Sequence, residues 1–150
     1  MAGLWPLFAS ASFWLGTWAQ TTGAICIESY AWAYNSYGQS PCMVAAYLQQ
    51  QCTGAPVNIP ALRQNTLYAV PTSNATNGSC ECSSVVYSLM SACASCQLGN
   101  YVSWSAWSKN CTTVYMNVFP KVVPVETDVP GWAYNFDLAV AFIFVRLLTN

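Results

Sequence analysis

Mostly apolar side chains recur at helical spacing in two parts of the chain. The first set follows the pattern i, i+3, i+4, i+8 and consists of Val44, Tyr47, Leu48 and Cys52. This spacing places the side chains on one face of an α-helix. Ser40 and Pro41 supply an N-cap residue and a residue favoured in the first helical turn, and Gly54 supplies a stop signal. The pattern predicts an amphipathic helix over residues 41–51.

The second set traces one face of another helix and consists of Val86, Leu89, Met90, Cys93 and Gln97. Ser83 or Ser84 can cap this helix at its start, and Gly99 follows its end, so the pattern predicts a helix over residues 84–97. A third, shorter helix is predicted over residues 104–113. It would place three residues on one side, namely Trp104, Trp107 and Cys111.

The segments between these helices lack a helical period. Aromatic residues alternate from Tyr30 to Tyr34, which predicts a short extended piece before a turn at residues 35–38. Residues 55–79 contain three prolines, so we expect a long irregular connection. Cys52 and Cys80 bracket this connection, which favours a connection that is pinned in place. A proline-containing, partly extended arm is expected before residues 132–134.

The two ends of the chain differ from the part between them. No charged side chain occurs in residues 1–18, and small residues occupy the −3 and −1 positions of a cut after Ala19. We interpret residues 1–19 as a signal peptide, residues 20–134 as the extracellular domain and residues 135–150 as an apolar tail. The tail is apolar from Leu138 to Leu148 apart from Arg146, and it is too short to span a bilayer.

Charge and composition exclude several classes of function. The 150 residues include four basic and five acidic side chains and no histidine. There is no basic footprint for nucleic acid, and no imidazole is present to act as a general base. A carboxylate-based hydrolase would need two acids facing one cleft, and Glu126 and Asp128 are the only close pair. We therefore expect a protein that is not an enzyme. The acidic residues are Glu28, Glu81, Glu126, Asp128 and Asp137.

Eight cysteines follow the signal peptide, an even number that favours disulfides in an oxidising compartment. Four thiolates at Cys-x-Cys and Cys-x-x-Cys spacing could instead bind zinc, but the gap between the pairs is short. A redox function for the Cys-x-x-Cys pair would need a βαβ context, which is absent. We expect no metal and no cofactor. The expected disulfide residues are Cys26, Cys42, Cys52, Cys80, Cys82, Cys93, Cys96 and Cys111.

The spacing of the cysteines also limits how they pair. We expect the helices 41–51 and 84–97 to be cross-linked, with Cys93 or Cys96 bonded to Cys42 or Cys52. Cys80 and Cys82 lie too close in sequence to pair with each other comfortably. Four disulfides would stabilise a core that two or three helices alone leave small.

Two further sets of residues are candidates for extracellular roles. Three sequons predict N-glycosylation at Asn74, Asn77 and Asn110. Exposed tryptophans could form a platform on which sugar rings stack, although large aromatic side chains more often belong to the core. The platform candidates are Trp32, Trp104, Trp107 and Trp132.

The order of the cysteines resembles the spacing of the CFEM domain, an eight-cysteine module of fungal surface proteins. The likeness is best from Cys80 to Cys111. The chain departs from that pattern because a cysteine is missing shortly after Cys42, the gap from Cys52 to Cys80 is longer, and no Asp precedes Cys80. That Asp is the haem-iron ligand in haem-binding members, so the resemblance does not imply haem binding.

A second resemblance extends from Cys26 to Tyr134. The phrases WAYNSYGQSPCMVAAYL, CECSSVVYSLMSACASCQ, SWSAWSKNC and VPGWAY are similar to an uncharacterised family of secreted or membrane-anchored proteins of mushroom-forming fungi. Members typically continue past the WAY segment into a polar linker, a membrane-spanning helix and a cytoplasmic tail. The resemblance implies that residues 135–150 are an unspliced or truncated end of the gene model. It implies a location and no activity.

Together these patterns predict a small, mainly α-helical, disulfide-rich domain with long irregular loops, secreted or held at the cell surface. The expected function is that of a structural or interaction protein with an extracellular or cell-wall partner. We expect attachment to a membrane only if a spanning helix is missing from this chain, and we expect no nucleic-acid partner. The alternatives are a ligand-binding module for glycan, sterol or haem, and, less favoured, a hydrolase.

Overall fold

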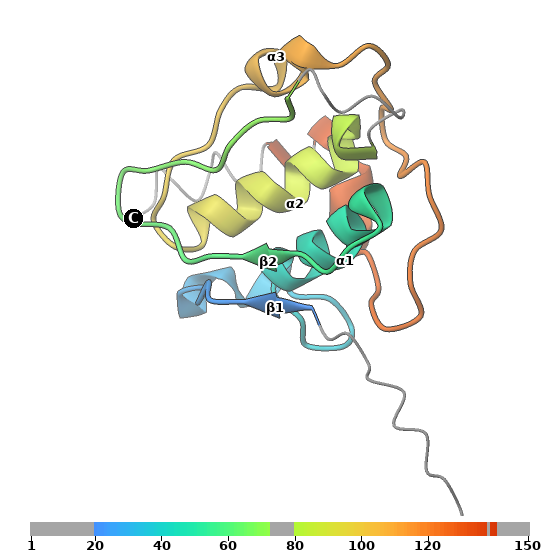
Figure 1. Cartoon of the computed structure of the whole chain (residues 1–150). Helices are drawn as coiled ribbons and strands as arrows, with labels where there is room; N and C mark the ends of the chain where they lie inside the picture. Colours follow the sequence, from blue (N-terminus) through green and yellow to red (C-terminus); the bar gives the residue numbers. More distant parts are fainter. Residues whose placement is uncertain (1–19, 73–79, 138, 141–150) are drawn as a thin grey trace, which may run out of the picture.

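The computed structural model describes residues 20–72, 80–137 and 139–140, which form a small, mainly helical domain with irregular loops (Figure 1). The elements follow in the order β1 (Thr21–Thr22), η1 (Glu28–Ala33), α1 (Pro41–Thr53), β2 (Asn58–Ile59), η2 (Cys80–Cys82), α2 (Ser84–Ser95), α3 (Trp104–Trp107), η3 (Ser108–Asn110) and η4 (Gly131–Tyr134), where η denotes a 3₁₀ helix. The predicted fold class is therefore confirmed. The signal peptide, Asn74, Asn77 and residues 141–150 lie outside the described residues.

The helix α2 crosses the middle of the domain, and other segments surround it (Figure 1). Every residue from Ser84 to Ser95 is buried. Burial extends beyond the face that the sequence pattern marks, because small serine and alanine side chains on the other faces let neighbouring segments approach closely. The helix is also two residues shorter than predicted. Leu98 then adopts a left-handed backbone with φ of 62°, and the Gly99 N–H donates to the Ala94 carbonyl at 2.9 Å.

The helix α1 packs beside α2 and confirms its sequence signals. The Ser40 side chain accepts a hydrogen bond from the Met43 N–H, and Gly54 ends the helix with a left-handed φ of 71°. The helix extends two residues beyond the predicted end at residue 51. Val44 and Leu48 are fully buried against the core.

The aromatic segment before α1 is a 3₁₀ helix over Glu28–Ala33, so the predicted extended piece is wrong. In a strand, alternate aromatic residues would share one face, but Tyr30 is 1% exposed whereas Tyr34 is 37% exposed. Tyr30 and Ala33 are buried instead, and side chains three residues apart lie in line on a 3₁₀ helix. The predicted turn at residues 35–38 is present, with the Gly38 N–H donating to the Asn35 carbonyl.

The third helix is shorter than predicted. It consists of α3, Trp104–Trp107, followed by the 3₁₀ turn η3, Ser108–Asn110, and ends three residues before residue 113. The Ser103 side chain caps its start by accepting from the Ala106 N–H. Trp107 is buried and Trp104 is half-buried.

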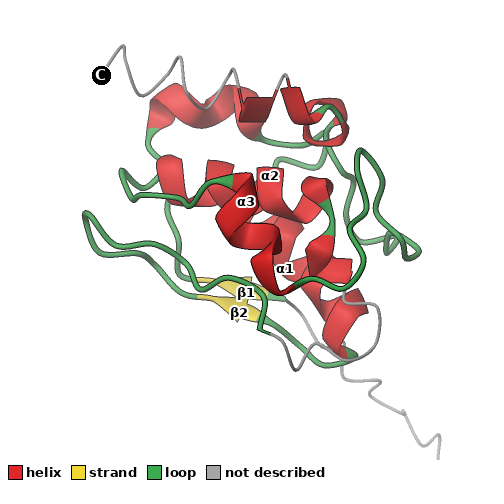
Figure 2. Ribbon diagram, turned by 90° about the horizontal axis from the view of Figure 1, so that it is seen from above, coloured by secondary structure: helices red, strands yellow, loops and turns green. Residues whose placement is uncertain are grey.

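The long connection after α1 is irregular over residues 55–72, apart from β2. Thr21 pairs with Asn58 and Thr22 with Ile59 in a two-stranded parallel sheet (Figure 2). The alternation of apolar and polar residues cannot predict strands of two residues, because their pairing depends on segments that lie far apart in the sequence. Cys52 and Cys80 are bonded to each other, so this connection is pinned at both ends as predicted.

Four disulfides join the segment Cys80–Cys96 to the rest of the domain. The pairs are Cys26–Cys96, Cys42–Cys93, Cys52–Cys80 and Cys82–Cys111, with Cα atoms 4.6 to 5.9 Å apart. One cysteine of every pair belongs to this segment, and none of the eight, all in the described part of the chain, is free. The predicted cross-link between the two main helices is the Cys42–Cys93 bond.

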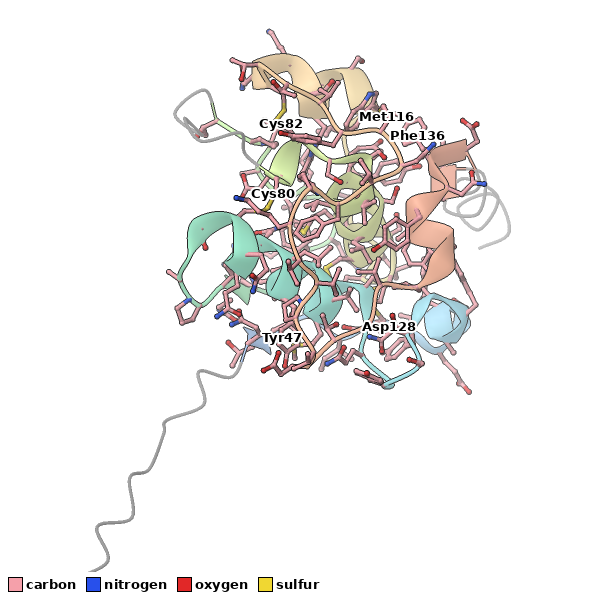
Figure 3. The ribbon with its side chains drawn as sticks, turned by 90° about the vertical axis from the view of Figure 1, so that its right-hand side faces the viewer. Tyr47, Cys80, Cys82, Met116, Asp128 and Phe136 are labelled. Carbon is pink, nitrogen blue, oxygen red and sulfur yellow. A yellow bond between two sulfur atoms is a disulfide. The ribbon has the colours of Figure 1, made fainter. Side chains whose placement is uncertain are left out.

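The arm, residues 112–130, leads from η3 to η4 and crosses one face of the domain (Figure 3). Figure 3 shows Met116 and Asp128 near its two ends, with Phe136 beside Met116. Helical backbone resumes after η4, where the Ala139 N–H donates to the Asn135 carbonyl and Ala139 is fully buried. Within the described ranges, no helix has the length and apolar character needed to cross a membrane.

The burial of α2 predicts that the same substitution, leucine to alanine, lowers the free energy of unfolding by different amounts inside and outside this helix. Leu89→Ala, at a fully buried position, should lower the free energy of unfolding by about 2–5 kcal/mol because it leaves a cavity. Leu67→Ala is the matched control, since Leu67 is 50% exposed and its change should be within about 0.5 kcal/mol. Urea unfolding of both variants measures the difference. Equal decreases in the free energy of unfolding for the two variants would contradict the central position of α2.

Candidate functional site

A cleft with a volume of about 280 Å³ lies beside α2. Its lining comes from β2, from the chain that follows β2, and from α1, η2, α2 and α3. Figure 1 shows where these helices and strands lie relative to one another. A smaller recess adjoins the cleft and shares Tyr68, Met90 and Trp107 with it. The cleft is lined by Gln49, Asn58, Ile59, Pro60, Tyr68, Ala69, Val70, Pro71, Thr72, Glu81, Met90 and Trp107.

Hydrogen bonds and disulfides hold the walls of the cleft together. The Trp107 indole N–H donates to the Glu81 carbonyl at 2.9 Å, which joins α3 to η2. The Asn110 side-chain amide donates to the Pro71 carbonyl at 3.1 Å, which joins η3 to the outer wall. The Cys82–Cys111 bond also joins η2 to the end of η3, and the Cys52–Cys80 bond joins α1 to η2. The walls of the cleft are therefore joined to one another within the chain itself.

Tyr68 and Gln97 fix the wall that follows β2. The Tyr68 hydroxyl donates to the Pro60 carbonyl at 2.7 Å and accepts from the Gln97 side-chain amide at 2.9 Å. The Gln97 Oε1 atom accepts from the Leu62 N–H at 2.8 Å. Burial raises the pKa of the Tyr68 hydroxyl above its ordinary value of 10.0, and the hydrogen bond from Gln97 partly offsets this increase. The hydroxyl is therefore neutral at physiological pH.

The charges around the cleft restrict its chemistry. Among the described residues that line it, Glu81 is the only acid, and there is no lysine or arginine. The close acidic pair, Glu126 and Asp128, lies on the arm instead, where the Ser36 hydroxyl donates to the Asp128 carboxylate at 3.1 Å. The lining of the cleft thus lacks the paired carboxylates that a glycoside hydrolase requires.

The four tryptophans do not form one surface. Trp32 and Trp132 pack edge to face with ring centroids 5.5 Å apart. Trp104 and Trp107 form a second cluster around Tyr87, with centroid distances of 5.3 and 5.7 Å. Trp107 is buried, and the other three are half-buried against the core. The structure does not bring the predicted platform residues together.

The cysteines offer no thiolate site. The sulfur atoms of Cys26, Cys42 and Cys96 lie within 4.8 Å of one another, close enough to suggest metal ligands. All three belong to disulfides, so none is a thiolate. The four cysteines considered as zinc ligands, which include Cys80 and Cys82, are likewise each bonded to a partner outside that set.

Sequence reasoning missed the cleft and its two fixing residues, Tyr68 and Gln97. Tyr68 lies in a connection without periodicity, and Gln97 was interpreted as part of a helix face. Asn110 was predicted as a glycosylation site, and its side chain is exposed although its amide is bonded to the cleft wall. The only signal for the cleft was the prediction that residues 55–79 are pinned.

The chain matches no family model, and neither the curated proteins nor the solved structures include one that is significantly similar to it.

The pKa of Tyr68 leads to a testable dependence of stability on pH. The pKa of Tyr68 in the folded protein is raised above its ordinary value of 10.0. The contribution of the neutral hydroxyl to stability is therefore fully present below the pKa of the unfolded chain, and it is lost as the pH rises through the pKa of the folded protein. Burial raises the pKa of three other tyrosines in the same way, namely Tyr87, Tyr101 and Tyr134. Tyr68→Phe should therefore reduce, without abolishing, the loss of stability between pH 8 and pH 11.

Urea midpoints of the parent protein and Tyr68→Phe across this range provide the measurement. Tyr37→Phe is the control, because Tyr37 is 60% exposed. A parent protein that became more stable above pH 10 would be inconsistent with the raised pKa values. So would a Tyr68→Phe variant with an unchanged slope.

Proposed function

We propose that this protein is an extracellular, non-catalytic interaction domain of the cell surface or cell wall, and that it binds its partner through the arm. The observation that carries the proposal is a series of exposed aliphatic side chains on residues 114–125. Val122 and Val125 are 82% and 87% exposed. Soluble domains seldom expose so many apolar groups in one segment unless a partner covers them. The series consists of Val114, Met116, Val118, Val122 and Val125.

The backbone of the arm is held in place independently of any partner. The Tyr115 N–H donates to the Cys82 carbonyl at 3.0 Å, and the Ser84 N–H donates to the Tyr115 carbonyl at 2.9 Å. Near the other end, the Thr127 hydroxyl donates to the Gln39 side chain at 2.7 Å. These contacts fix the arm at both ends, so its apolar side chains are presented to solvent as an ordered surface.

The alternation at the start of the arm supports a binding edge. Tyr115 is half-buried and faces the domain, whereas its neighbours Val114 and Met116 are exposed. The Ser83 hydroxyl donates to the Val118 carbonyl, which keeps this piece extended along the start of α2. The arm carries a single cation, Lys121, so a partner surface that is apolar and uncharged fits it better than an acidic one.

Export through residues 1–19 is part of the same proposal. The four disulfides indicate an oxidising environment. Gln20, the residue after the proposed cut, is buried, and its side chain is hydrogen-bonded to Gln50 and to the Val57 N–H. The described part of the chain is thus already packed at Gln20, which supports a cut before this residue. N-glycans on Asn74, Asn77 and Asn110 and the resemblance to a fungal surface family are consistent with this location.

Charged substitutions on the arm test the proposal. In the native host, Val122→Asp with Val125→Asp should shift the protein from the cell-surface fraction to the medium, because the partner would have to bury two unpaired carboxylates. Quantitative blotting of the two fractions measures the shift. The positions are exposed, so the unfolding midpoint should stay unchanged.

The matched control is Ile25→Asp, since Ile25 is 84% exposed and lies outside the arm. It should leave the distribution between the fractions as it is in the parent protein. Retention of the arm variant at the surface would refute the assignment of the arm, and intracellular retention of the parent protein would refute export.

A further inference from the structure

We propose that the cleft beside α2 binds one ring of a neutral sugar, such as the terminal unit of a glycan. This inference is independent of the arm, because the two surfaces share no residue. It rests on the size of the cleft, on the chemistry of its lining and on the way in which its walls are fixed.

The volume of the cleft limits the ligand to a small one. Pockets that enclose drug-sized molecules measure roughly 300–1,000 Å³, and the cleft lies just below this range at about 280 Å³. It is half-open to solvent, so a single ring can enter while the rest of a longer chain stays outside. The rigid four-ring body of a sterol and the macrocycle of haem are too large for it.

The polar side of the cleft matches vicinal hydroxyl groups. Its polar side chains are two carboxamides, a hydroxyl and a carboxylate, from Gln49, Asn58, Thr72 and Glu81. The Gln49 amide makes no hydrogen bond to the described part of the chain, so both its donor and its acceptor are available. Asn58 uses its Oδ1 atom to accept from the Thr21 hydroxyl at 3.0 Å, which leaves its Nδ2 atom as a donor.

The described lining of the cleft offers no cation to an anionic ligand. A phosphate, a sulfate or an acidic sugar would find no lysine or arginine among these residues to neutralise its charge. A neutral ring needs no such partner, because its hydroxyl groups can pair with carboxamide and hydroxyl side chains.

The apolar side of the cleft matches the C–H face of a pyranose ring. Tyr68, Met90 and Pro71 supply apolar surface there, and the half-buried Tyr68 ring is the aromatic group that is partly accessible. Trp107 also lines the cleft, but it is buried, and its indole N–H already donates to the Glu81 backbone carbonyl. An alkylammonium ligand would favour several open aromatic faces around the cation, and the cleft offers one.

The fixed walls remove much of the cost of binding. Tyr68 is held by Pro60 and Gln97, and the Cys52–Cys80 bond closes the connection that forms the outer wall. A site that is ordered before the ligand arrives loses little conformational entropy on binding.

Ligand-observed NMR by saturation transfer tests the proposal on the disulfide-bonded protein. The protein is first deglycosylated enzymatically, so that no sugar of its own competes. The probes are methyl pyranosides of neutral hexoses and N-acetylhexosamines, with tetramethylammonium and inorganic phosphate as comparison ligands. At least one pyranoside should give a saturable signal, and phosphate should give none.

Two substitutions in the cleft and one outside it locate the binding. Gln49→Ala and Thr72→Val should each weaken pyranoside binding about three- to tenfold, the effect of one lost neutral hydrogen bond. Gln64→Ala is the matched control, since Gln64 is exposed and does not line the cleft, and it should bind as the parent does. Near-ultraviolet circular dichroism verifies that each variant is folded.

Failure of every pyranoside to give a saturable signal would overturn the inference. Binding that both cleft variants leave unchanged would overturn the assignment to this site. Binding of tetramethylammonium without any pyranoside would overturn the class of ligand. None of these results affects the arm, whose test uses Val122 and Val125, so failure of this inference and failure of the proposed function are distinguishable.

Discussion

The fold depends on one constraint, which is that α2 is buried on all sides and covalently joined to its surroundings at both ends. Its faces carry either large apolar side chains such as Leu89 or small ones such as Ser88, so neighbouring segments contact it from every direction. Burial of apolar area supplies most of the stabilisation of such a core. In a domain with few helices and long irregular segments, the remainder comes from disulfides, each of which contributes about 2–4 kcal/mol.

The two surfaces to which we assign functions follow from that constraint. The arm starts at the Cys82–Cys111 bond and is hydrogen-bonded along the start of α2, so its apolar side chains point to solvent in a fixed order. The cleft lies on another part of the same helix, where Met90 forms part of its lining and the Cys52–Cys80 bond closes its outer wall. Both surfaces are irregular chain held on a rigid support, which is the usual way in which loops carry binding sites.

Local signals predicted well wherever a local cause decides the structure. Helix α1 begins after Ser40 and ends before Gly54, because an N-cap side chain and a left-handed backbone at the C-cap each act within one turn. Prediction failed where distant segments decide. The spacing of Tyr30 and Tyr34 suggested a strand, but burial of Tyr30 with Ala33 selects a 3₁₀ helix. The cleft could not be inferred, because the contact between Tyr68 and Gln97 joins residues that no sequence pattern relates.

Disulfide mapping tests the central claim most directly. Proteolysis of the unreduced protein under acidic conditions, followed by mass spectrometry, should recover four linked peptide pairs, each containing one cysteine of the Cys80–Cys96 segment, and no free thiol. The informative pair is Cys42–Cys93, since it joins α1 to α2. A bond within the segment, such as Cys80–Cys82 or Cys93–Cys96, or any free cysteine among the eight, would contradict the account.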